Sequence, residues 1–474
     1  MAGTLRPRFL YLAGFCCFSA QGRFMSLFLA QYCGLDEAAV GQMLALPSLL
    51  TAAAPVLWAL LAERRGLRPV LVLCAAGSSA IFSAALVPSV RASFMAMLLV
   101  RCGASVLMSG MSPLMDAFCL ESLQAGEGLA SEDEAPAGPE RDLARKSLYG
   151  RERLWGAVSW ALCHLALGWL LDAHGFVVMP ISSLVATALF CALLWWGAHR
   201  AQPVRLSPAD SCADGLELTS PAAAAGAPAA GTTAHAATPA DGGGADLAAT
   251  GRDETMAGFY RDLFLHPYHA SFVATIFLIS AGSSLVEGLV FLFFKNELAA
   301  TNLLMGLSVV VTVAFEVPFF QVGSQITKLL GGDLMLVLGL LAYASRVVLY
   351  TLVPADSIGL LLLIEPLHGV TYSLNQLSSV LHVTAMAPAG KEKVAQGTLS
   401  SIKALGTATG ALLGALAMER FGPVAVYRGA GAIVFAQTVL FAAMTRCFRP
   451  RPEAPRYARL QGPSDAAQGT MPVE

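Results

Sequence analysis

Charged residues are scarce in this chain. Asp, Glu, Lys and Arg make up 13% of its 474 residues, whereas hydrophobic residues make up 56%. A soluble globular domain carries about a quarter charged residues, so this composition argues against one. The net charge of −2 offers no basic surface to nucleic acid. We therefore expect the lipid bilayer as the main partner and no nucleic acid.

Motifs for metal, redox or covalent chemistry are also missing. The ten cysteines are scattered, with no CxxC pair and no metal-ligand spacing, so they read as small core residues of a reduced protein. No nucleophile–base set or phosphate-binding loop is visible. We expect neither an enzyme nor a cofactor. The first apolar stretch lacks a small-residue cleavage site, so it is interpreted as a retained helix.

Twelve apolar stretches fill the chain, six on each side of one polar insert. In lipid, backbone polar groups must be satisfied within their own segment, and about 20 apolar residues span the bilayer as a helix. We predict an all-α membrane protein in which twelve transmembrane helices form two six-helix bundles. The predicted helices cover residues 9–30, 38–61, 69–87, 93–120, 154–171, 176–198, 270–294, 303–325, 334–353, 358–385, 396–418 and 424–445.

Polar segments divide the chain into predicted parts. Residues 1–200 are expected to form the N-terminal bundle and residues 263–448 the C-terminal bundle. Between them, residues 201–262 lack apolar periodicity and are predicted to be a disordered linker. Residues 449–474 are predicted to be a polar tail. A second insert, residues 124–139, is acidic and also loop-like. The roles of the inserts at 124–146 and 201–262 do not follow from the sequence.

The basic residues predict the orientation. If both termini lie inside, most of the 30 Lys and Arg residues fall in inner loops and tails, as the positive-inside rule requires. We therefore expect both termini and the linker in the cytosol. The segment 59–66, after the second helix, is echoed by 323–331, after the eighth. Such repetition is typical of a duplicated carrier.

Charged residues inside the predicted helices are few. Each costs about 2.5–3.5 kcal/mol at the bilayer centre unless it faces a partner or water. Four are basic and four are acidic, so we expect them to pair across the bundle. They are Arg23, Arg101, Arg346, Lys403, Asp116, Glu287, Glu316 and Glu365.

Polar side chains follow one face of the helix predicted at 358–385. Glu365, His368, Tyr372 and Asn375 step by three or four residues, a spacing that puts them on one face. Similar polar faces on other helices predict a central cavity lined mainly by helices 1, 4, 7 and 10. The candidate substrate ligands are Arg23, Arg101, His164, Tyr372, Asn375 and Lys403.

Structural roles compete with these assignments. His164 fits a core position as well as a cavity. Arg346 lies on a helix expected at the periphery, and we favour a structural role for it. Asp116 is near the inner end of its helix, where an ion pair with a loop arginine is expected. A ridge of small residues on the eleventh helix is interpreted as a helix-packing surface; it comprises Gly406, Gly410 and Gly414.

Glu365 and His368 form the sharpest hypothesis for proton coupling. They lie one turn apart near the middle of the tenth helix. Buried carboxylates and imidazoles are the side chains that exchange protons at physiological pH. Pro366 between them is expected to loosen the helix. Glu287 and Glu316 are the competing proton sites.

Several segments resemble the major facilitator superfamily. Residues 59–68 are similar to its loop 2–3 signature G-x-L-A-D-R-x-G-R-[RK], with Ala59 for the glycine, Glu63 for the aspartate and Leu67 for an arginine. The segment 149–156 resembles Y-G-x-x-R-x-W-G at the start of helix 5 in one branch, although Ala157 replaces its next serine. Segments 112–117, 316–319 and 368–372 are similar to the same branch.

That branch includes oligosaccharide–proton and nucleoside–proton symporters and the orphans called major facilitator superfamily domain-containing protein 6. The resemblance implies a twelve-helix fold, alternating access and a carboxylate–imidazole proton site on helix 10, which agrees with Glu365 and His368. It also implies a gating loop. The residues of this loop that match are Glu63, Arg64, Gly66 and Arg68.

The sequence therefore predicts a secondary carrier that moves a small polar solute, coupled to protons and acting as a monomer. Because the membrane charges cancel, a neutral solute such as a sugar or nucleoside is favoured, and a carboxylate held by Arg23, Arg101 or Lys403 remains open. An uncoupled facilitator or exchanger is the second hypothesis, and a non-transporting receptor or scaffold is the third. The protein is expected in the plasma membrane or an endomembrane, and neither the solute nor the direction of transport follows from the sequence.

Overall fold

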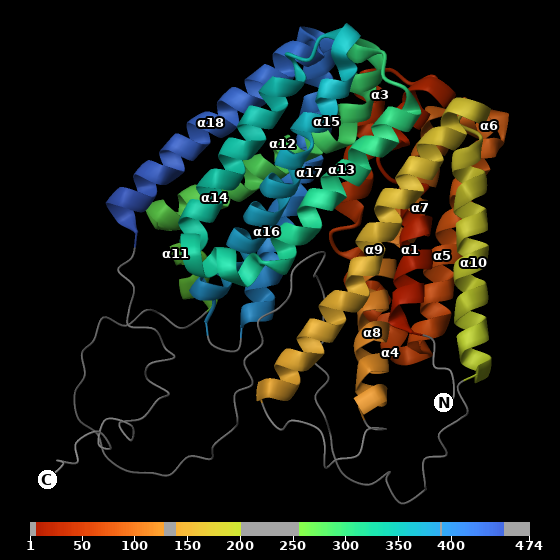
Figure 1. Cartoon of the computed structure of the whole chain (residues 1–474), viewed down its shortest axis with the longest axis horizontal. Coiled ribbons are helices and arrows are strands. Elements are labelled where there is room, and N and C mark those ends of the chain that lie inside the picture. The colour runs from red at the N-terminus through yellow and green to blue at the C-terminus, as the bar shows by residue number, and fades with distance from the viewer. Residues whose placement is uncertain (1–5, 128–138, 201–255, 389–390, 450–474) are drawn as a thin grey trace, which may run out of the picture.

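The computed structural model describes residues 6–127, 139–200, 256–388 and 391–449. The regular elements in these ranges are helices, and they form two groups, one from each half of the chain (Figure 1). The groups meet at the end that holds α3 and α13. They diverge toward the end that holds α4, α8 and α11 (Figure 1).

The first group begins with a broken helix. Its elements are α1 (Pro7–Ser19), α2 (Met25–Leu27), a π-helical turn (Phe28–Tyr32), α3 (Glu37–Leu50), α4 (Ala54–Arg65), α5 (Leu67–Ser83) with a 3-10 turn (Ala84–Leu86), α6 (Pro88–Arg91), α7 (Phe94–Met108), α8 (Met111–Glu127), α9 (Pro139–His174) and α10 (Val178–Arg200).

The second group has fewer breaks. Its elements are α11 (Met256–Leu265), α12 (Pro267–Leu298), α13 (Asn302–Gln321), α14 (Gly323–Tyr350), a 3-10 turn (Ala355–Leu360), α15 (Leu361–Ile364), α16 (Pro366–Met386), α17 (Glu392–Phe421) and α18 (Pro423–Phe448).

Ten helical segments among the described residues are long and apolar enough to cross a membrane. The pair α3 and α4, bent by 45°, makes an eleventh if it counts as one span. The first predicted helix is the exception, because α1 has 13 residues and the chain turns before α2. Each of the twelve predicted ranges nevertheless contains helix.

Two segments are more helical than expected. The linker was predicted to reach residue 262, but α11 already begins at Met256. This helix buries Phe259 and Leu263 and leaves Phe264 exposed, so the short apolar run after the polar insert suffices to form a helix. Within the acidic insert, α9 begins at Pro139. The rest of the linker, most of the tail and residues 128–138 lie outside the described residues.

Proline sets the break at the predicted tenth helix. Pro366 stands at the first position of α16 and has no N–H to donate, so α15 ends just before it. Glu365 occupies the junction, where its carbonyl accepts a hydrogen bond from the His368 N–H at 2.9 Å. The loosening expected from Pro366 is confirmed, and it places Glu365 between two helical segments.

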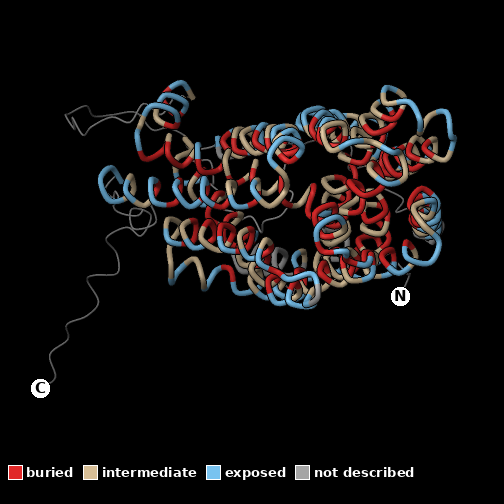
Figure 2. Tube along the Cα trace, turned by 90° about the horizontal axis from the view of Figure 1, so that it is seen from above, coloured by how far each residue is buried: buried red, intermediate tan, exposed pale blue. Residues whose placement is uncertain are grey.

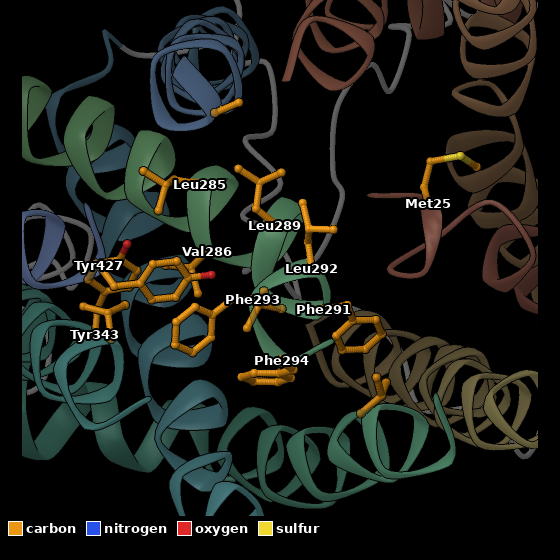
Figure 3. Packing of buried hydrophobic residues seen from close by; sticks show 14 of the residues in the cluster. Met25, Leu285, Val286, Leu289, Phe291, Leu292, Phe293, Phe294, Tyr343 and Tyr427 are labelled. Carbon is orange, nitrogen blue, oxygen red and sulfur yellow. The ribbon is translucent and has the colours of Figure 1, made fainter. Parts of the chain in front are cut away.

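Apolar packing around α12 forms the core of the second group (Figure 3). Phe293 stacks on Tyr427 with ring centroids 4.7 Å apart, and Phe294 meets Tyr350 edge to face. The small-residue ridge of α17 also packs on α12, as predicted. Gly406 and Gly410 lie against backbone atoms of that helix, at distances a larger side chain would not allow.

Exposed residues lie on the outside of both groups and buried residues concentrate within them (Figure 2). Many of the exposed residues are large and apolar. Leu57, Leu99 and Trp195 are among the most exposed. Such a surface is unfavourable in water and is normal where acyl chains are the solvent.

Candidate functional site

A cluster of charged side chains lies where the two groups meet, centred on Glu287 of α12. Arg23 of the first group places Nη2 2.6 Å from Glu287 Oε2. Arg346 of α14 places Nη2 2.5 Å from Glu287 Oε1, and His368 of α16 places Nδ1 2.8 Å from the same oxygen. Arg346 also contacts His368 through Nη1. One carboxylate is therefore surrounded by two guanidinium groups and an imidazole.

Arg23 lies in the turn that interrupts the first helix before α2. His164 of α9 donates from Nδ1 to the carbonyl of Trp160 at 2.8 Å, so its Nε2 is free to accept. That Nε2 accepts the backbone N–H of Arg23 at 3.4 Å. His164 is fully enclosed. Its ring thus contacts the backbone that carries Arg23, and it is not open to a solute in this conformation.

Glu365 forms a second centre, next to the first. The residue is 2% exposed, and its carboxylate accepts hydrogen bonds from Thr312 Oγ1 at 2.9 Å and from the Tyr350 hydroxyl at 3.0 Å. The guanidinium of Arg346 lies over the rings of Tyr350 and Tyr343, at 5.7 and 5.9 Å from their centroids. Tyr350 therefore contacts both Glu365 and Arg346.

Arg346 was expected to be structural because its helix was expected at the periphery. The structure instead places it at the centre of the cluster, 1% exposed and in contact with both Glu287 and His368. Thr312 and Tyr350 were also missed. Thr312 lies on α13 and Tyr350 ends α14, and a sequence gives no signal for which buried carboxylate such a residue will meet.

Other predicted residues border the cluster without joining it. Tyr372 stacks on His368 with an interplanar angle of 6° and is 39% exposed. The side-chain amide of Asn375 is buried against Gly339 and has no hydrogen-bond partner among the described residues. Glu316 is half-buried on α13, and the described residues give its carboxylate no ion-pair partner.

Two predicted cations lie apart from the Glu287 cluster. Lys403 of α17 donates from Nζ to Gln376 Oε1 at 2.7 Å and to Ser379 Oγ at 3.0 Å. Arg101 of α7 is buried, and no ion pair or hydrogen bond joins it to the described residues.

The predicted gating loop joins α4 to α5. Gly66 adopts φ 90°, a conformation that favours glycine, and its N–H donates to the Ala62 carbonyl. Arg68 lies over the ring of Phe118, 5.7 Å from its centroid. Glu63 and Arg64 are exposed, and in the described part of the chain neither has an ion pair.

The end opposite this loop is closed by contacts between the two groups. There α9 packs along α13, and α3 packs along α17. Asp172 of α9 accepts hydrogen bonds from the backbone N–H of Asn302 at 3.0 Å and of Leu303 at 2.8 Å. A carboxylate of one group thus caps a helix of the other.

The other end carries a similar polar centre in each group. Tyr11 donates to Asp116 at 2.6 Å, and Arg153 lies 3.3 Å from the same carboxylate. In the second group, Tyr268 donates to Asp333 at 2.6 Å. His382 Nε2 and Arg449 Nε lie 2.8 and 3.0 Å from the same carboxylate. The ion pair expected for Asp116 is therefore present.

Comparisons with known proteins fit this architecture. The profile of the MFS_1 like family matches residues 5–429. A maltose permease from Geobacillus stearothermophilus is 24% identical over 428 residues, which is 90% of each chain.

Solved structures share the fold. The nucleoside transporter NupG has a TM-score of 0.68 at 14% identity, covering 93% of this chain and 98% of that one. An auto-inhibited peptide transporter of the POT family has a TM-score of 0.61 at 12% identity, covering 94% and 99%. The resemblance to the major facilitator superfamily is confirmed. The apolar helices and these relatives identify an integral, multi-pass membrane protein of a transporter family rather than an enzyme class.

Proposed function

Because the chain belongs to the MFS_1 like family, a family of secondary transporters, we propose that it couples movement of a small polar solute to protons by alternating access. The observation that carries this proposal is the ion pair between Arg23 and Glu287. It joins the two helix groups through a carboxylate that also holds His368. Carboxylate and imidazole are the groups that a proton-coupled carrier needs at such an interface.

We propose twelve spans in two six-helix domains. The first span comprises α1, α2 and the π-helical turn, and the second comprises the bent pair α3 and α4. Arg64 and Arg65 follow the second span, and the positive-inside rule places them, with both termini, in the cytosol. The segment that connects the groups is then a cytosolic linker.

The conformation of the structure is then an inward-facing one. The contacts between the groups, including Asp172 with Asn302, are at the end away from the Arg64 loop. This outer end is closed, and the cytosolic end is the one at which the groups diverge (Figure 1). A carrier must also visit the opposite arrangement, so these contacts have to break once in each cycle.

A proton on Glu287 weakens the link between the groups. The ionised carboxylate holds Arg23 and Arg346 at 2.6 and 2.5 Å. Breaking a buried ion pair while both charges remain costs about 3–5 kcal/mol. Protonation removes the negative charge, so Arg23 separates from Glu287 at lower cost and the outer end opens. Glu365 and Glu316 are further proton sites in this scheme, and Tyr372 and Asn375 border the solute.

Transport in proteoliposomes tests this proposal. A panel of radiolabelled sugars, nucleosides and carboxylic acids is offered with and without an inward proton gradient. We expect one class to accumulate only with the gradient. Glu287→Gln and Glu365→Gln should lose this accumulation and keep part of the exchange without a gradient. Uptake by the wild type that only equilibrates the solute across the membrane, equally with and without the gradient, would instead identify an uncoupled facilitator.

A further inference from the structure

Arg101 is a buried cation with no counter-charge among the described residues. Its side chain lies on α7, the residue is 7% exposed, and its Nε is enclosed with no hydrogen-bond partner among the described residues. A guanidinium cannot be deprotonated, so it cannot escape this position by losing its charge. Burial of an unpaired charge is unfavourable, and a residue that keeps one at bilayer depth is a candidate for function.

The side chain of Arg101 points into the protein. Leu99, two residues earlier, lies about 200° around the helix axis and is 66% exposed, so it marks the lipid-facing side of α7. Met97 and Ala104 flank Arg101 and are buried. Arg101 is seven residues beyond Phe94, the start of α7, which puts it about 10 Å along the axis. This depth and direction keep it from a lipid headgroup.

Once the ion pairs are assigned, the interior of the protein holds more cations than carboxylates. A neutral solute was favoured because Asp116 balanced the cations, but Asp116 pairs with Arg153. Glu287 is shared by Arg23 and Arg346. Without Asp116, the interior set holds four cations against three carboxylates. The cations are Arg23, Arg101, Arg346 and Lys403, and the carboxylates are Glu287, Glu316 and Glu365.

We propose that the solute is an organic anion with one carboxylate, and that Arg101 binds this carboxylate. The inference rests on the proposed transport function and specifies its substrate class. The planar guanidinium presents paired N–H donors that match the two oxygens of a carboxylate. Lys403, whose two hydrogen-bond partners Gln376 and Ser379 are uncharged, is the second cation on the solute's path and lies nearer the cytosolic end.

Ligand binding to the purified full chain tests the inference without transport. The probes are benzoate and hippurate, their uncharged amides benzamide and hippuramide, and inorganic phosphate alone. Thermal unfolding in detergent is followed at increasing probe concentration for the wild type, Arg101→Gln and Arg101→Lys. The matched control is Arg428→Gln, because Arg428 is an exposed arginine at the end of the second group.

We expect saturable stabilisation of the wild type and of Arg428→Gln by the carboxylates and by neither amide. Arg101→Gln should weaken binding at least about tenfold, and Arg101→Lys should weaken it less. Without a probe, Arg101→Gln should melt no lower than the wild type, because it removes an unpaired buried charge. Equal stabilisation by amides or by phosphate, no stabilisation by carboxylates, or full carboxylate binding by Arg101→Gln would each overturn the inference.

Failure of this inference and failure of the proposed function give different results. Proton-driven transport of a sugar or nucleoside, with no carboxylate binding, would contradict the anion site at Arg101 and support the carrier function. Carboxylate binding that depends on Arg101, without transport of any solute across liposomes, would support the anion site and contradict the carrier.

Discussion

The carboxylate of Asp172, on α9, caps the first turn of α13 through the backbone N–H groups of Asn302 and Leu303. Asp172 and Asn302 are 130 positions apart in the chain. The cap therefore does more than stabilise one helix, because it fastens one helix group to the other at the closed end.

Substitution Asp172→Asn should favour opening of the closed end. The neutral amide loses the charge that complements the helix N-terminus, a loss of about 1 kcal/mol. Ser308 is buried on α13 below the cap. We expect a cysteine introduced at this position to react faster when Asp172→Asn is also present. The measurement is the labelling rate of Ser308→Cys by a membrane-impermeant maleimide, with and without Asp172→Asn.

A cap within one group provides the control for this labelling. Asp36 accepts the Ala39 N–H at 2.7 Å and caps α3, its own helix. Asp36→Asn should cost similar stability and leave the labelling of Ser308→Cys unchanged. Equal acceleration by both substitutions would show that general destabilisation, and not the link between the groups, exposes α13.

Arg346 should be essential for stability as well as for transport. Arg346→Met leaves Glu287 with fewer cations in a buried site, and removing one partner of a buried pair costs about 3–5 kcal/mol. Arg428→Met, at an exposed arginine that donates to Thr351, should change stability by less than about 0.5 kcal/mol. Thermal unfolding of both variants checks this, and a peripheral role for Arg346 predicts equal effects.

The two tyrosines Tyr350 and Tyr427 form a matched pair. Both are fully buried, but only the Tyr350 hydroxyl has a partner among the described residues, the Glu365 carboxylate. Tyr350→Phe should destabilise by about 1–3 kcal/mol because it leaves a buried acceptor short of a donor. Tyr427→Phe removes an unpaired hydroxyl and should be neutral or stabilising. Chemical denaturation of both variants distinguishes these outcomes, and a reversed order would contradict the assigned hydrogen bond.

Close packing between α12 and α17 predicts that two glycines of α17 differ in their tolerance of a side chain. A side chain at Gly410 would collide with the backbone of Ala281, whereas Gly397, on the same helix, has open space around it. Gly410→Ala should therefore cost about 1–3 kcal/mol through overpacking, and Gly397→Ala should be tolerated. Expression level and melting temperature of the two variants report the difference; similar losses at both positions would argue against close packing at Gly410.

Much of the fold could be predicted from the sequence because lipid imposes a simple rule on apolar segments. Every predicted range contains helix, and the ridge at Gly410 packs as its spacing indicates. The break in the first helix could not be foreseen. At this break His164 contacts the Arg23 backbone from a helix more than a hundred residues away. Such a contact leaves no periodic pattern in the sequence.

The charged site was harder to predict than the fold. The helical face of Glu365 and His368 follows from spacing, but helical periodicity cannot tell which charges pair. Arg346 lies on a helix that periodicity places at the periphery, yet its long side chain reaches Glu287. Asp116 forms the ion pair that its place near the end of the helix predicts, with Arg153, and so does not balance a cation of the central cluster. Pairing depends on tertiary distances, and these decide the charge of the interior.

Distances between spin labels across the two groups test the central claim most directly. One pair replaces Arg64 and Lys328 at the end where the groups diverge, and the other replaces His174 and Glu297 at the closed end; all four are exposed. Labels are attached through unnatural amino acids, so the native cysteines remain. Glu152→Gln, which breaks an ion pair with Arg8 inside one group, is the control and should move neither distance.

Glu287→Gln, which imitates the protonated carboxylate, is expected to lengthen the distance at the closed end and shorten the one at the diverging end in the same molecules. That opposite movement is what release of Arg23 from Glu287 predicts. If both distances stay as in the wild type, or if both lengthen together, the Arg23–Glu287 pair does not control which end is open, and the account is contradicted.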